Sequence, residues 1–137
     1  MNANENIAMA EQILAYTFND KLLCAEALQM AAPTTFLVVN NNFEGVKNNK
    51  RLAVLGDVAL AQALCKMWYQ ATDGAGQLQP PGAWTELRND ILGNANLSRV
   101  GESLGLGRII VMSEGNGGHA SPRMLATTVE AMAGAVY

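Results

Sequence analysis

Residues 49–69 read NKRLAVLGDVALAQALCKMWY and form the longest stretch with an unbroken helical pattern of apolar residues. Steps of three and four between apolar residues predict a helix with one apolar face, made of Leu52, Leu55, Ala59, Ala63 and Met67. Asp57 lies in the middle of this stretch. A carboxylate in such a place is seldom buried unless it is paired or holds a cation. The helix Asn49–Tyr69 therefore constrains the fold most, because its acid needs a partner.

Length and composition indicate one globular, helical domain. The chain has 137 residues, half of them hydrophobic and 15% charged, which is typical of a single folded domain with its own core. Ala, Leu and Met are frequent, and these residues favour helices. No internal repeat or low-complexity tract is present. We therefore expect one all-α domain over residues 1–137.

The charge balance and the cysteines limit the function classes. The net charge is −3 and only nine Lys and Arg are present. This composition argues against strong nonspecific binding to nucleic acid. Cys24 and Cys65 both lie in apolar helical patterns, so we expect buried free thiols and an intracellular, reducing location. A single histidine excludes an ordinary zinc site. No secretory signal and no apolar run of membrane-spanning length are expected.

Apolar periodicity and helix breakers predict the other elements. The expected helices cover residues 7–15, 21–30, 49–69, 83–92, 94–104 and 123–137. Asn48 or Asn49 is the expected N-cap of the third helix. Residues 34–39 are β-branched and aromatic and could form a strand, but flanking Asn-rich turns favour an irregular connection.

Four segments, in order along the chain, resemble the ribonuclease III domain family. KRLAVLGD at Lys50–Asp57 is similar to the family signature ERLEFLGD, and EAMAGAVY at Glu130–Tyr137 is similar to the second signature. Tyr16–Leu28 and Leu87–Leu106 resemble two further family segments. The resemblance covers nearly the whole chain and implies the all-α ribonuclease III endonuclease-domain fold. No double-stranded-RNA-binding domain is expected beside it.

The resemblance implies a metal site built by two helices. In the family, four carboxylates hold Mg²⁺, two from each signature, and the ions activate a water and stabilise charge on the phosphate under attack. In this sequence Asp57 and Glu130 match two of these positions, and we expect them as metal ligands and catalytic residues. Ala53 and Thr127 stand at the other two positions. Lys50 replaces the acid that opens the first signature.

This incomplete ligand set predicts weak catalysis. Ala53 offers no oxygen, and the neutral hydroxyl of Thr127 replaces a charged ligand. Because one or two carboxylates hold Mg²⁺ when substrate phosphates complete its shell, Asp57 and Glu130 are expected to bind one Mg²⁺, or Mn²⁺ in its place, weakly. Loss of one group that stabilises a transition state costs about 10²–10³ in rate. We therefore expect a pseudoenzyme with little or no cleavage activity.

Simpler interpretations of the same residues remain open. Asp57 could pair with Arg51 or Lys50, or cap nearby backbone, and Glu130 could be an ordinary helix acid. Gly56 and Gly134 are expected to be close-packing positions and not ligand contacts.

The resemblance also implies a dimer that forms through the helix Asn49–Tyr69. Val54 stands where the family has an aromatic that inserts into the partner, so the interface is expected to be repacked. Leu55 and Val58 would otherwise be exposed. The expected partner is a second copy or another ribonuclease III chain, and double-stranded or structured RNA is the expected ligand.

Two other functions stay open at this stage. One is an active Mg²⁺-dependent endonuclease of double-stranded RNA that uses Asp57 and Glu130. The other is a structural protein–protein module without RNA function, which the acidic pI of about 5.0 favours.

Overall fold

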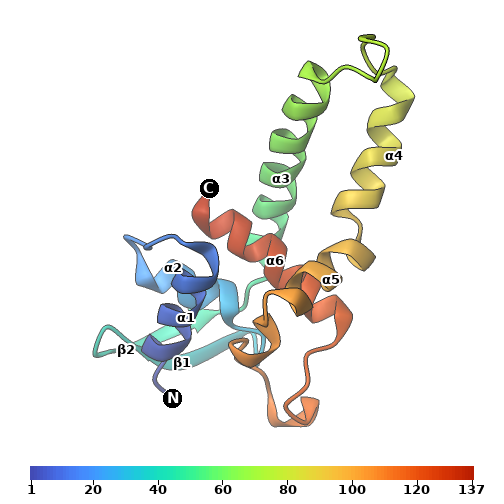
Figure 1. The fold of residues 1–137 in the computed structure, drawn as a ribbon. Helices are drawn as coiled ribbons and strands as arrows, with labels where there is room; N and C mark the ends of the chain where they lie inside the picture. The colour runs from blue at the N-terminus through green and yellow to red at the C-terminus, as the bar shows by residue number, and fades with distance from the viewer.

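The structure, a computed structural model, describes residues 1–137 except for the side chain of Asn116. Its elements, in chain order, are α1 (Asn4–Leu14), α2 (Lys21–Leu28), β1 (Thr34–Val39), β2 (Asn42–Lys47), α3 (Lys50–Gln70), α4 (Pro81–Leu92), α5 (Asn94–Ser103), η1 (Leu106–Arg108), η2 (Glu114–Asn116) and α6 (Pro122–Val136). In Figure 1, α1, α2 and the strands cluster at one end, whereas α3 and α4 project from the body as two arms. The predominance of helices confirms the predicted class.

The segment after α2 folds as a β-hairpin, so the predicted irregular connection was wrong. β1 pairs with β2 antiparallel, with Thr34 opposite Lys47 and Val39 opposite Asn42. Asn40 and Asn41 both have positive φ, 51° and 66°, which is the backbone of the tightest hairpin turns and is tolerated by Asn. The turn residues that flank the segment therefore close a hairpin instead of excluding a strand.

Helix α3 buries only the N-terminal end of the apolar face that its periodicity predicted. Leu52, Ala53 and Gly56 are buried, whereas Leu55 is 43% and Met67 67% exposed. The predicted apolar face of α3 is therefore largely open to solvent. Periodicity identifies an apolar face but does not say whether the same chain covers it.

The start of α3 is fixed by a buried asparagine. Asn49 is the N-cap residue, as predicted, but its side chain makes no cap hydrogen bond. Instead its Nδ2 donates to the Ala27 carbonyl oxygen at 3.0 Å and to Thr128 Oγ1 at 3.2 Å. Asn49 and Thr128 are both fully buried, so these bonds join α3 to α2 and α6 where water is excluded.

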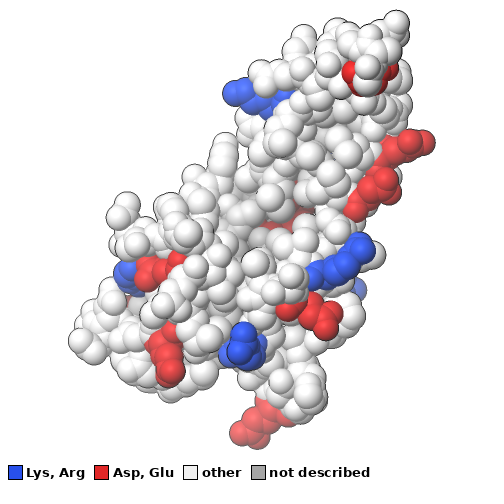
Figure 2. All heavy atoms as spheres, in the orientation of Figure 1, with Lys and Arg blue, Asp and Glu red and all other residues white. Residues whose placement is uncertain are grey.

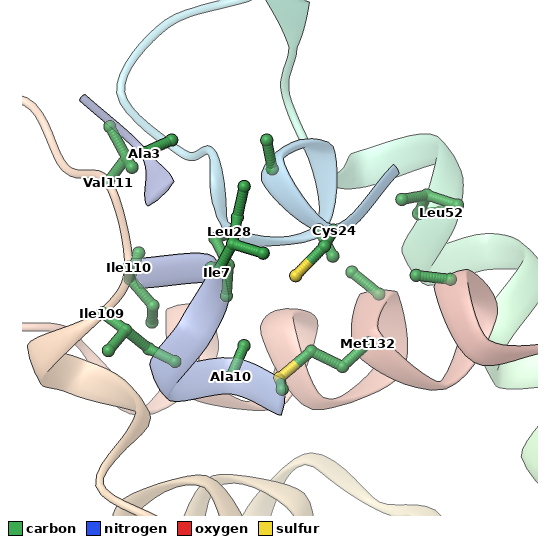
Figure 3. Packing of buried hydrophobic residues seen from close by; sticks show 14 of the residues in the cluster. Ala3, Ile7, Ala10, Cys24, Leu28, Leu52, Ile109, Ile110, Val111 and Met132 are labelled. Carbon is green, nitrogen blue, oxygen red and sulfur yellow. The ribbon is translucent and has the colours of Figure 1, made fainter. Parts of the chain in front are cut away.

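The hydrophobic core lies where α1, α2, η1 and α6 meet (Figure 3). Cys24, Leu28 and Met132 point into it from α2 and α6. Burial raises the pKa of the Cys24 thiol to about 12, so this cysteine is an inert core residue. Cys65 is only partly buried, so the expectation of two buried thiols holds for Cys24 alone.

One expectation about membrane segments was wrong. Helix α3, with 21 residues, is long and apolar enough to cross a membrane by length and composition. The same length and composition suit a helix whose exposed apolar face meets a protein partner. Its packing on α6, described next, is that of a folded-domain helix.

Helices α3 and α6 cross so closely that their backbones touch. A Cβ added at Gly56 would overlap the carbonyl oxygen of Glu130, and one at Gly134 would overlap the carbonyl oxygen of Leu52. Each glycine thus faces the backbone of the opposite helix, and the smallest side chain would push the helices apart. This confirms the prediction that Gly56 and Gly134 are close-packing positions.

We expect Gly134→Ala to lower the free energy of unfolding by about 1–3 kcal/mol, which is the usual cost of overpacking a core. The matched control is Gly82→Ala in α4, where an added Cβ meets nothing within 4 Å. Urea denaturation followed by circular dichroism measures both. Equal unfolding free energies for the two variants would contradict the backbone contact between α3 and α6.

Candidate functional site

The glycine crossing brings the two predicted acids together. Asp57 follows Gly56 on α3, and Glu130 is the residue of α6 whose backbone faces Gly56. The two side chains lie close enough that Asp57 raises the pKa of Glu130. Figure 2 shows acidic atoms recessed between the α3 and α4 arms, whereas the other charged groups in this view project from the surface. The structure therefore assembles the pair that the two sequence signatures predicted.

A third charged group completes this cluster. Arg88, on α4, places Nη2 at 3.4 Å from Asp57 Oδ1 and 3.3 Å from Asp57 Oδ2. The side chains of Arg88 and Asp57 are 38% and 40% exposed. The suggested pairing of Asp57 with Arg51 or Lys50 was therefore wrong, because the partner comes from another helix.

The surroundings of Glu130 hold its proton more tightly than water would. Burial and, after it, the neighbouring carboxyl of Asp57 raise the pKa of Glu130, and Arg88 lowers it; the net result is a pKa of about 7. Two carboxyl groups this close resist being ionised together. Near neutral pH Glu130 is therefore partly protonated.

The residues present do not fit the four-carboxylate cage of the family. Ala53 is buried, 8% exposed, and supplies no ligand atom. Thr127 is partly buried and brings only a neutral hydroxyl. Among the residues that the structure describes, no three His, Cys, Asp or Glu side chains lie close enough to hold a metal ion. The charged group that contacts the acid pair in the described part of the chain is the guanidinium of Arg88.

Two contacts hold the α4 arm beside α3. Trp68 and Trp84 pack with ring centroids 5.9 Å apart and an interplanar angle of 48°. Arg88 and Asp57 form the second contact, one turn further along α4 from Trp84. Because α4 has no buried residue, these pairs carry much of its attachment. The two tryptophans therefore anchor α4 to α3.

Arg88 is the site residue that sequence reasoning missed. It lies in the segment Leu87–Leu106, which resembles the family, but no local sequence pattern marks this arginine as a partner of Asp57. The contact depends on the chain reversing through residues 71–80 and returning α4 along α3 (Figure 1). The sequence feature that could have indicated this contact is a basic residue on a helix that follows a Gly- and Pro-rich loop, because such a loop can reverse the chain direction.

Comparisons with known proteins agree with this geometry. The family model for ribonuclease-III-like domains matches residues 34–137. Ribonuclease 3 of Nitrosomonas europaea is 33% identical over 129 residues, which are 92% of this chain and 46% of that protein. Ribonuclease 3 of Campylobacter jejuni is 32% identical over 138 residues, covering 97% of this chain and 54% of that protein. The chain thus spans about half the length of the curated relatives it matches.

A solved structure shows the same fold. The nuclease domain of ribonuclease III from Campylobacter jejuni superposes with a TM-score of 0.75 at 30% identity, and the match covers 95% of this chain and 83% of that one. In that domain, a region involved in dimer formation is structurally flexible. The protein described here belongs to the ribonuclease-III-like family, and its predicted endonuclease-domain fold is confirmed.

The raised pKa of Glu130 makes stability depend on pH. Below about 4.5 the group is protonated in both states. Between about 4.5 and 7 the folded chain keeps a proton that the unfolded chain releases, so stability falls as the pH rises through this range. Glu130→Gln removes the titratable group and with it this decrease in stability at rising pH.

The measurement is the unfolding midpoint temperature of wild type and Glu130→Gln in chelator-containing buffer across that range. We expect the variant to gain stability over wild type as the pH rises. Glu26, whose pKa burial also raises, is common to both proteins and cancels in the difference. Parallel pH curves would contradict the shift.

Proposed function

We propose that the protein is a ribonuclease III-like domain that dimerises and binds double-stranded or structured RNA in RNA processing, with little or no cleavage. The observation that carries this proposal is the acid pair. Asp57 and Glu130 meet, but Ala53 and Thr127 stand at the other two ligand positions. If each missing ligand costs about 10²–10³ in rate, little activity remains.

The acid pair is proposed to hold at most one divalent ion. Mg²⁺ takes hard oxygen ligands, and two carboxylates hold it only when other oxygens, such as RNA phosphates, complete its shell. Mn²⁺ accepts the same ligands. Binding without RNA is therefore expected to be weak.

The exposed face of α3 supports dimerisation. Val54 and Val58, one helical turn apart on α3, are 69% and 60% exposed, and Leu55 beside them is 43% exposed. An apolar face of this extent on a projecting helix is typical of a protein interface. The Campylobacter nuclease domain, which has a region involved in dimer formation, supports dimerisation. We propose a homodimer through α3, with another ribonuclease III chain as the alternative partner.

Cleavage is tested with long double-stranded RNA in Mg²⁺ and in Mn²⁺. We expect wild type to show no more cleavage than Asp57→Asn, which removes one charge from the pair and serves as the matched control. Discrete products from wild type that Asp57→Asn abolishes would establish an active endonuclease and overturn the impairment.

RNA binding is measured by fluorescence anisotropy of a labelled duplex at two salt concentrations. We expect a complex that weakens as salt rises, because phosphate contacts release counterions. The acidic composition, with net charge −3, predicts a shallow salt dependence. Absence of any complex at low salt would favour a structural module without RNA function.

Val54→Asp is expected to weaken self-association by about tenfold or more, because it places a charge in an apolar interface. The matched control is Val100→Asp on α5, which is 37% exposed and lies outside the projecting arms. Analytical ultracentrifugation gives the association constants, and circular dichroism confirms folding. A wild-type dimer that Val54→Asp leaves intact would exclude the α3 face.

A further inference from the structure

The charge balance at the acid pair points to the role of Arg88. The cluster contains two carboxyl groups and one guanidinium, so its formal charge is −1 when both acids are ionised. One nitrogen of Arg88 lies 3.3–3.4 Å from both oxygens of Asp57. The side of the Asp57 carboxylate that both oxygens share therefore already faces a cation.

We propose that Arg88 is the resident counter-cation of Asp57, and that its guanidinium competes with divalent ions for the carboxyl pair. A guanidinium and a divalent ion repel each other, so the ion must displace Arg88 or bind beside a positive charge. With two acids instead of four, too little negative charge is present for both cations. Arg88 thereby sets the metal affinity of the site.

The position of Arg88 favours this role over that of a surface ion pair. Its helix α4 buries no residue, and Arg88 reaches back from it to Asp57. Its Nη2 faces both oxygens of Asp57, so Arg88 occupies the carboxylate that any ion held by Asp57 and Glu130 would also need.

The inference rests on the incomplete ligand set of the proposed function, but not on RNA binding or cleavage. Its test therefore uses Mn²⁺ alone, without RNA, and follows the loss of the free-ion signal by electron paramagnetic resonance. A failure of RNA binding leaves this measurement unaffected, so the two proposals are tested separately.

We expect Arg88→Gln to bind Mn²⁺ about tenfold or more tightly than wild type. The added Asp57→Asn exchange abolishes this gain. The matched control is Arg99→Gln on α5, which removes the same charge from an exposed arginine whose Nη2 donates to Asn96 Oδ1 at 3.2 Å. Equal Mn²⁺ affinities for Arg88→Gln and Arg99→Gln would overturn the proposal.

A second measurement needs no variant and applies if Arg88→Gln does not fold. In wild type, Mg²⁺ at concentrations that fill the site is expected to shift the side-chain Nε–Hε resonance of Arg88, while that of Arg99 stays unchanged. Filling of the site without any change at Arg88 would show that the guanidinium and the ion do not compete, and would overturn the proposal.

Discussion

The backbone contact between α3 and α6 is the constraint on which the rest of the structure depends. Gly56 and Gly134 each face a carbonyl group of the opposite helix. Because the contact allows no Cβ, it fixes the separation of the helices more tightly than side-chain packing does. Asp57 and Glu130 take their positions from it, one beside the contact on each helix. The acid pair is therefore a consequence of how the helices cross.

Much of the fold and half of the site were predictable from the sequence. Periodicity predicts the helices, and the two signatures predict that Asp57 and Glu130 meet and that Gly56 and Gly134 pack closely. These features are local or belong to one pair of matched segments. What remained unpredicted involves contacts between segments that no local pattern relates, namely the β-hairpin and the pairing of Arg88 with Asp57.

The exposed face of α3 shows the same limit of sequence reasoning. Periodicity predicts an apolar stripe along the helix, but α6 covers only the part around Leu52 and Gly56, and Leu55 and Met67 stay exposed. Gly56 allows the close crossing, whereas Val54 and Val58 stay exposed and available to a partner. One helix thus presents two surfaces, and apolar periodicity alone does not separate them.

The same geometry explains how a ligand set can be reduced while the scaffold persists. A carboxylate at Ala53, which is buried, would add a third acid next to Asp57 and Glu130 and would need a bound cation to be stable. Alanine removes that requirement, and Arg88 offsets one of the two acids that remain. Neither the glycine contact nor the outer face of α3 depends on an ion. Under the proposed function, the two missing ligands would therefore lower activity without disturbing the fold.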